Sequence, residues 1–141
     1  RELFSAVRDR GATLNGERIS VSDEADLGDS LLCTGFSYGE DEIEENLVLF
    51  NRLMRSSRSV RRDGSAALDL SYVACGRFEG FWELSLHPWD VAAGSLIVEE
   101  AGGKVTLFDG SPCTIYDREC LASNGAVHQV VSDELLRSSS L

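Results

Sequence analysis

Downstream of residue 30, short apolar runs alternate with longer segments in which apolar residues recur every three or four positions. A short apolar run bounded by turn residues is typical of a buried strand, and the longer period is typical of an amphipathic helix. The predicted strands are Leu31–Phe36, Ser59–Arg62, Phe78–Leu84, Lys104–Phe108 and Cys120–Ser123. The predicted helices are Glu40–Ser56, Gly64–Cys75, Pro88–Ala101 and Ala126–Leu136.

Residues with strong positional preferences mark where these helices begin and end. Pro88 suits the first turn of a helix, and Gly76 and Gly102 each follow a helical pattern that they are expected to end. The tail Ser138–Ser140 is expected to fray, as chain ends often do. The first helix is expected to have one apolar face, made up of Ile43, Leu47, Phe50, Leu53 and Met54.

The N-terminal segment follows a different pattern, with two short strands around a turn. The strands are predicted at Leu3–Val7 and Arg18–Val21, and Asn15 with Gly16 is a dipeptide typical of a tight hairpin. Residues 23–30 are polar and acidic and are expected to connect the hairpin to the next strand. Because an isolated hairpin is at best marginally stable in water, this one is expected to add to a sheet supplied by another part of the protein.

The order of elements after the hairpin favours a layered α/β fold. Strands and helices alternate, which is the pattern of a sheet with helices on its faces. We therefore predict an α-β-α arrangement around a mixed, largely parallel sheet, preceded by a β-hairpin. The predicted domain boundaries are 1–27 for the hairpin and 28–141 for the α/β domain.

Composition narrows the functional classes without choosing one. The 141 residues carry a net charge of −11 that is spread along the chain. Direct binding to nucleic acid or to an anionic membrane is disfavoured, because both need a basic face. The carboxylates either form an ordinary solvated surface or include some that hold a hard cation. No apolar run reaches the length of about 18 residues that a membrane span needs.

Cysteine usage and the N-terminus favour a cytoplasmic location. The first residues, Arg1–Phe4, have neither the basic nor the apolar region of a signal peptide. The cysteines form no CxxC pair and are expected to be free thiols in a reducing compartment. They are Cys33, Cys75, Cys113 and Cys120.

The stretch Glu83–Gly103 contains the clearest candidate for chemistry. Asp90 falls in the first turn of a helix, where the helix dipole stabilises a carboxylate by about 0.3–1 kcal/mol. Free N–H groups at the same helix end can receive a phosphate oxygen, and Mg²⁺ could lie between the two negative groups. On spacing alone, a plain helix cap is the commoner explanation of Asp90. The core is likewise the commoner place for Trp89.

Three stretches, in order along the chain, resemble one enzyme family. WDVAAG at residues 89–94, followed by IVEEAGG at 97–103, is similar to the C-terminal signature of the inositol monophosphatase family. FSAVRDRGATLNG at 4–16 resembles the hairpin ahead of the family's C-terminal half, and RRDGSAA at 61–67 resembles the segment ahead of its substrate-facing helix. The resemblance implies that the hairpin belongs to the antiparallel sheet of a missing N-terminal half.

The resemblance also implies roles for particular residues. Asp90 would be a ligand of Mg²⁺, a catalytic residue and a neighbour of the substrate hydroxyls. Gly64, Ser65 and Ala66 would line the substrate pocket through their backbone. Glu83 would accept hydrogen bonds from a hydroxyl group of a polyol.

Three further residues receive weaker assignments. Glu79 occupies a nearby position at which the family often has an acidic residue, although on sequence alone Glu79 and Glu83 could both be exposed strand carboxylates. His87 is expected to order the loop before Asp90 rather than to act as a general base. His128 is expected to lie on the surface of the last helix.

The activity implied is Mg²⁺-dependent hydrolysis of a phosphate monoester, with inositol monophosphate as the default substrate and a homodimer as the common assembly. Other substrates within the family are fructose bisphosphate, nucleotide 3′-phosphates and histidinol phosphate. The competing hypothesis is a non-catalytic protein-interaction or regulatory module on the same fold, since some bacterial relatives are associated with transcription complexes.

The chain departs from the family pattern at its metal ligands. The family's upstream glutamate and its Asp-Pro-x-Asp-Gly-Thr loop have no counterpart in this sequence. A single carboxylate rarely supports a magnesium site, because Mg²⁺ gives up its water reluctantly. We therefore expect the chain to be the C-terminal half of an enzyme and to be inactive on its own.

Overall fold

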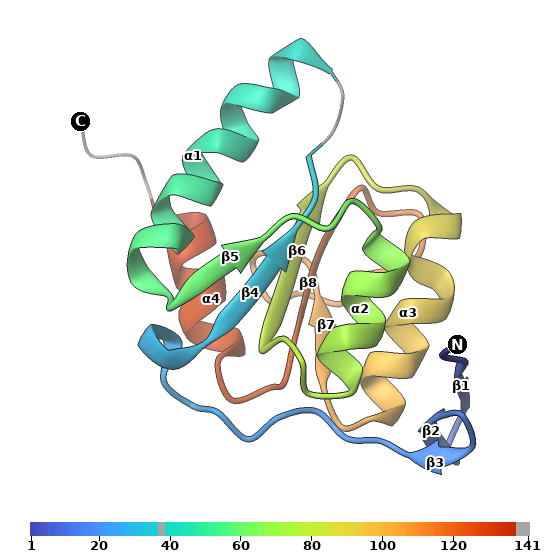
Figure 1. Ribbon diagram of the computed structural model, residues 1–141. Coiled ribbons are helices and arrows are strands. Elements are labelled where there is room, and N and C mark those ends of the chain that lie inside the picture. Colours follow the sequence, from blue (N-terminus) through green and yellow to red (C-terminus); the bar gives the residue numbers. More distant parts are fainter. Residues whose placement is uncertain (37–38, 138–141) are drawn as a thin grey trace.

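The computed structural model describes residues 1–36 and 39–137, with the backbone alone at residues 40–41. These residues form a five-stranded sheet with helices on both faces, and a three-stranded sheet lies at one end of the molecule (Figure 1). The predicted tail Ser138–Ser140 lies outside the described residues. No helix in the described part of the chain is long and apolar enough to span a bilayer.

The five-stranded sheet is mixed, as predicted. Its strands are β4 (Leu31–Thr34), β5 (Ser59–Arg61), β6 (Gly80–Leu84), β7 (Lys104–Thr106) and β8 (Glu119–Ser123), in the spatial order β5-β4-β6-β8-β7. β4 pairs in parallel with β5 and β6, whereas β8 pairs antiparallel with β6 and β7. Four of the five strands therefore share one direction.

Two helices cover each face of this sheet (Figure 1). The helices are α1 (Glu40–Ser56) and α4 (His128–Leu136) on one face, and α2 (Ala66–Ala74) and α3 (Pro88–Glu100) on the other. Gly76 follows α2 with φ +76°, the left-handed conformation of a glycine that ends a helix. A single 3₁₀ turn, η1 (Leu27–Asp29), lies in the segment predicted to be a plain connection.

Alternation along the strands divides the core into two layers. Leu32 and Trp82 belong to the layer under α1 and α4, whereas their neighbours Cys33 and Phe81 belong to the layer under α2 and α3. All four side chains are fully buried. The period of two therefore gives both faces of the sheet an apolar layer for helices to cover.

The helices α2 and α3 pack closely at a glycine. A Cβ atom at Gly94 of α3 would come within 2.6 Å of Leu70 on α2. The small residues of the 92–94 segment therefore allow this close approach. Since both helices begin at the same end of the sheet, their close packing places two helix N-termini near one another (Figure 1).

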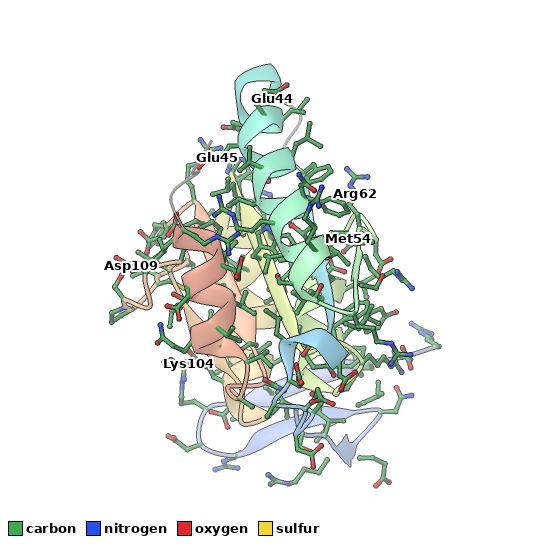
Figure 2. The ribbon with its side chains drawn as sticks, turned by 90° about the vertical axis from the view of Figure 1, so that its left-hand side faces the viewer. Glu44, Glu45, Met54, Arg62, Lys104 and Asp109 are labelled. Atoms are coloured by element: carbon green, nitrogen blue, oxygen red, sulfur yellow. The ribbon has the colours of Figure 1, made fainter. Side chains whose placement is uncertain are left out.

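The predicted apolar face of α1 is wrong at three positions, which are exposed: Ile43, Leu47 and Met54. The buried side chains are Asn46, Leu49 and Leu53, which follow helical spacing but lie on a face rotated from the predicted one. The periodicity predicted the helix but not which of its faces packs against α4 and the sheet. Figure 2 shows Glu44 and Glu45 on the part of α1 that projects beyond the sheet.

The N-terminal segment forms three strands rather than the predicted two. They are β1 (Phe4–Val7), β2 (Gly11–Leu14) and β3 (Glu17–Arg18). Asn15 and Gly16, with φ +52° and +86°, form a turn between β2 and β3, but β1 pairs with β2 and not with the strand after this turn. β2 was missed because a four-residue strand that begins with glycine gives a weak pattern.

The small sheet is held against α3 by charged and apolar contacts. The Glu100 carboxylate accepts hydrogen bonds from the N–H groups of Asp9 at 2.9 Å and Gly11 at 2.7 Å. Phe4 and Ala6 pack against the core layer of α2 and α3. The domain boundary between residues 27 and 28 stays a prediction.

Candidate functional site

A pocket of about 460 Å³ lies at the carboxyl ends of the parallel strands β4, β5 and β6. Its walls come from the segments that follow these strands and from the first turns of α2 and α3. This edge is where open α/β sheets bind their ligands. The residues assigned from the resemblance all line this pocket: Gly64, Ser65, Ala66, Glu83 and Asp90.

The N-terminus of α2 forms one wall. Gly64 has φ +85°, which favours glycine, and it turns the chain from β5 into the helix. The Ser65 hydroxyl accepts a hydrogen bond from the N–H of Leu68 at 3.4 Å and caps the helix. Because the first N–H groups of a helix have no intrahelical acceptor, this wall favours an anionic ligand.

The N-terminus of α3 contributes the Asp90 carboxylate. Its Oδ2 accepts a hydrogen bond from the N–H of His87 at 2.9 Å, and the N–H of Asp90 donates to the His87 carbonyl at 2.9 Å. Asp90 is therefore a helix cap and also lines the pocket. A carboxylate has about four acceptor positions, so the capping bond leaves capacity for a metal ion.

The residues before Asp90 only partly match expectation. His87 helps to order the loop through its backbone, as predicted. Its ring stacks on the Trp89 ring with centroids 4.8 Å apart and an interplanar angle of 23°. Trp89 is 77% exposed, so the expectation of a core residue is wrong. The first helical turn directs this side chain to solvent rather than to α2.

Glu83 reaches the pocket from β6 and is partly buried. A Cβ atom at Gly35 would overlap its carboxyl group, so the absence of a side chain at Gly35 makes room for Glu83. Burial, followed by the negative charges of Asp69 and Asp90, raises the pKa of Glu83 to about 7. The Arg62 guanidinium acts in the opposite direction.

Asp69 is a residue that sequence reasoning missed. It lies on α2, is 0% exposed, and neither of its carboxylate oxygens has a hydrogen-bond partner within the described chain. Burial and then the charge of Asp63 raise its pKa to about 7. A signal was present, because an acidic residue inside an otherwise apolar helical stretch needs an explanation.

Glu79 lies away from the pocket, contrary to expectation. It precedes β6 at the opposite end from Glu83, and its exposed fraction is 9%. Its Oε2 accepts a hydrogen bond from the N–H of Leu31 at 2.6 Å. Glu79 therefore links β4 to β6 and is neither an exposed carboxylate nor a substrate contact.

His128 is buried, so its predicted place on the surface is wrong. Its exposed fraction is 3%, and its two ring nitrogens lie 2.8 Å from Thr106 Oγ1 and 2.8 Å from Ser123 Oγ. Burial and the charge of Lys104 lower the pKa of His128 to about 4. As the first residue of α4, it turns inward to the strands instead of outward.

Other side chains line the pocket without a role assigned from sequence. They include Glu42, Arg62, Ser85 and Arg118. Ser85 has φ +62°, an unfavourable conformation for a residue with a side chain, and such strain is common at functional sites. Arg62 lies 6.0 Å from the centre of the Phe36 ring and is seen beside α1 in Figure 2.

The chain fits one part of a magnesium site. Among residues 1–36 and 39–137, no three carboxylate, histidine or cysteine side chains cluster so as to hold a metal ion. Asp90 offers one carboxylate oxygen donor, the type that Mg²⁺ prefers, beside a wall that favours an anion. All four cysteines are free, as predicted.

Fold and pocket together define a layered α/β protein in which two helix N-termini and several carboxylates line one pocket. A model of the inositol monophosphatase family matches residues 1–140. The chain belongs to this family, and the predicted family and fold class are confirmed.

Individual relatives agree with this assignment. The chain is 48% identical to an inositol-1-monophosphatase of Synechocystis over 136 residues, which are 96% of this chain and 47% of the relative. It is 43% identical to the Nus factor SuhB of Escherichia coli over 127 residues, 89% of this chain and 48% of that protein. The solved inositol monophosphatase of Anabaena (Nostoc) superposes with a TM-score of 0.94 at 47% identity, covering 99% of this chain and 56% of that one. The chain thus spans about half the length of these proteins.

Proposed function

We propose that this chain is the C-terminal half of a Mg²⁺-dependent phosphomonoesterase that acts on inositol monophosphate or a similar small sugar or polyol phosphate. The observation that carries the proposal is the pocket, in which Asp90, Glu83 and the Gly64–Ala66 turn meet around one cavity. The name of the Synechocystis relative supports inositol monophosphate as the substrate.

Different residues of the pocket bind different parts of the substrate. The first turn of α2 receives a phosphate oxygen through its free N–H groups, and Glu83 accepts a hydrogen bond from a hydroxyl of the alcohol. Asp90 would provide one carboxylate ligand for Mg²⁺. When bound, Mg²⁺ would polarise the phosphoryl oxygens and lower the pKa of the attacking water.

The proposal places the remaining metal ligands in the half of the relatives that this chain does not cover. The isolated chain is therefore expected to show little or no turnover. We also propose a cytoplasmic homodimer that does not bind nucleic acid directly, in keeping with the net charge of −11.

The decisive experiment measures phosphate release from inositol monophosphate by the full-length protein that contains this chain, with Mg²⁺ present. Asp90→Asn is expected to lower the rate by about 100-fold or more, because a metal ligand contributes several kcal/mol of transition-state stabilisation. Asp23→Asn, at an exposed position outside the pocket, is the matched control and should retain activity. An Asp90→Asn protein with the wild-type rate contradicts the assigned role.

A second candidate function is a non-catalytic interaction or regulatory module. It is favoured by the Escherichia coli relative, which is named a Nus factor and is 43% identical. The same assay separates the two candidates. A full-length protein that folds and binds Mg²⁺, yet releases phosphate from no small monoester, would support the interaction module.

A further inference from the structure

Two cysteine side chains lie together near the pocket and have no part in the proposed chemistry. The thiols of Cys113 and Cys120 are joined by a hydrogen bond, and both cysteines are free. Cys113 is half-buried in the segment between β7 and β8, whereas Cys120 is only 2% exposed within β8. Solvent can therefore reach one member of the pair, and the protein shields the other.

A turn in the chain brings the two cysteines together. The N–H of Asp117 donates to the Thr114 carbonyl at 3.2 Å, and the N–H of Thr114 donates to Asp117 Oδ2 at 2.7 Å. The chain reverses its direction between Cys113 and β8, so the two side chains meet across the turn.

The segment that contains this pair is attached to the pocket at two places. The N–H of Leu86 donates to the Arg118 carbonyl at 3.0 Å, and both residues line the pocket. In the antiparallel pairing of β6 and β8, Cys120 lies directly opposite Glu83, which also lines the pocket. Residues directly opposite on neighbouring strands have side chains on the same face of the sheet and close to one another. A movement of either cysteine is therefore expected to shift Arg118 or Glu83.

The hydrogen bond makes the accessible cysteine the nucleophile of the pair. Because Cys120 donates its S–H, the pKa of Cys113 is lowered from its usual value, although burial opposes this. The same hydrogen bond, followed by burial, raises the pKa of Cys120 well above its usual value. The thiolate is the form of cysteine that reacts with peroxides, and redox-sensitive cysteines are typically accessible thiolates beside a second cysteine.

We propose that Cys113 and Cys120 are a site of reversible oxidation, at which a hydroperoxide converts the two thiols to a disulfide and closes a ring that contains Arg118. A covalent bond brings the two sulfur atoms closer than a hydrogen bond does, so the segment at the pocket wall has to move. Oxidation therefore weakens substrate binding. This effect on the substrate rests on the proposed function, whereas the disulfide itself does not.

The oxidation by hydrogen peroxide takes two steps. The Cys113 thiolate attacks one peroxide oxygen, so that an S–O bond forms, the O–O bond breaks, and the other oxygen takes up a proton and leaves as water. The Cys120 sulfur then loses its proton and attacks the Cys113 sulfur, so that the S–S bond forms, the S–O bond breaks, and a second water leaves. Two thiols and one peroxide thus give one disulfide and two waters.

Peptide mapping of the full-length protein that contains this chain detects the disulfide without enzyme activity. Trypsin cleaves after Arg118 and so separates the two cysteines. After treatment with hydrogen peroxide, mass spectrometry should find residues 105–118 joined to residues 119–137, and dithiothreitol should release them. Cys113→Ser and Cys120→Ser should each lack the joined peptides. If wild type treated with peroxide also lacks them, the inference is overturned.

Cys75 is the matched control for reactivity. It is half-buried like Cys113, but burial raises its pKa, and its thiol donates to the Tyr72 carbonyl at 3.6 Å. In the reduced protein at pH 7, Cys113 is expected to react with iodoacetamide at least about tenfold faster than Cys75, because more of it is thiolate. Equal rates for the two cysteines would overturn the assignment of Cys113 as the nucleophile.

The kinetic test measures KM for inositol monophosphate before and after treatment with peroxide. Oxidation of wild type should raise KM by about threefold or more, since weakening one hydrogen bond to the substrate amounts to a factor of this order, and dithiothreitol should reverse the rise. Cys113→Ser keeps the size of the side chain and should have the wild-type KM under both conditions. An equal rise in this variant would overturn the role of the pair.

The tests separate this inference from the proposed function. If wild type releases no phosphate from small monoesters, the proposed function fails, while the joined peptides still decide whether the disulfide forms. If wild type is active and the joined peptides form without a change in KM, the effect of the disulfide on the pocket is overturned and the proposed function stands.

Discussion

Two groups of buried polar side chains lie on opposite faces of the sheet, and they differ in whether their polar atoms have hydrogen-bond partners. His128, at the start of α4, bonds through both ring nitrogens to Thr106 and Ser123. Asp69, on α2, has no partner for either oxygen within the described residues. α4 and α2 cover different faces of the sheet (Figure 1).

The contrast indicates which group serves stability and which serves function. Buried polar groups are normally hydrogen-bonded, and a satisfied network makes the native packing unique. An unsatisfied group is unfavourable for folding and is retained mainly where a site needs it. The strained backbone of Ser85 and the enclosed Glu83 carboxyl lie at the same end of the sheet as Asp69, which agrees with this division.

Removing the satisfied histidine is expected to have the largest effect on stability. His128→Ala leaves the hydroxyls of Thr106 and Ser123 without this partner and creates a cavity, so the free energy of unfolding should fall by about 3 kcal/mol. Urea denaturation of the full-length protein measures this change. Gln129→Ala, on the exposed side of α4, is the control and should change stability by less than about 0.5 kcal/mol. A loss below about 1 kcal/mol for His128→Ala would contradict the structural role.

Removing the unpaired Asp69 carboxylate should raise the stability of the protein at alkaline pH, whereas removing His128 lowers it. The pKa of Asp69 is raised from 3.8 to about 7 in the folded protein. Between these values the native state binds more protons than the unfolded state, so stability falls as pH rises through this window. Asp69→Asn cannot ionise and should be more stable than wild type at pH 8 by about 1–2 kcal/mol, with the advantage vanishing near pH 4.

The pH dependence of stability that arises from His128 runs in the opposite direction to that from Asp69. Its pKa is lowered from 6.5 to about 4, so the unfolded state binds more protons between these values. Stability from this group therefore rises with pH, and the slope is lost in His128→Ala. If Asp69→Asn and wild type show parallel stability curves from pH 4 to 8, Asp69 does not hold a proton in the folded protein.

Sequence reasoning named residues that the structure brings together at one pocket, but it missed part of their surroundings. The order of strands and helices, together with the WDVAAG and RRDGSAA stretches, located Asp90 and the Gly64–Ala66 turn at a common pocket. The roles of Asp90 and of the Gly64–Ala66 turn were implied by the resemblance, whereas the starts of their helices were predicted from local patterns such as a proline in a first helical turn. Local patterns survive in a single sequence, so they could be predicted.

The errors have a common physical origin, because spacing does not say where a neighbouring element lies. Alternation places Glu79 and Glu83 on the same face of a strand, yet four residues of strand separate them by about 13 Å, so one pocket wall cannot use both. Helical spacing identified α1 but not its rotation, and it could not show that His128 turns inward. Asp69 was missed although its place in an apolar helical stretch was a signal, because spacing did not show which face of α2 is buried.

The smallest effect is expected from a variant that moves the Glu83 carboxyl group without changing the residue. In Gly35→Ala the new Cβ atom would overlap the Glu83 carboxyl group, which is the flexible end of a side chain and can move aside. The free energy of unfolding should therefore change by less than about 1 kcal/mol, while KM for inositol monophosphate rises by about fivefold and kcat is retained. Gly28→Ala is the control, because its Cβ would meet the Asp26 side chain at 3.2 Å, away from the pocket. An unchanged KM in Gly35→Ala would mean that Glu83 does not define the position of the substrate. The unsatisfied carboxyl groups behind the pocket would then be tolerated by the fold and not used by it.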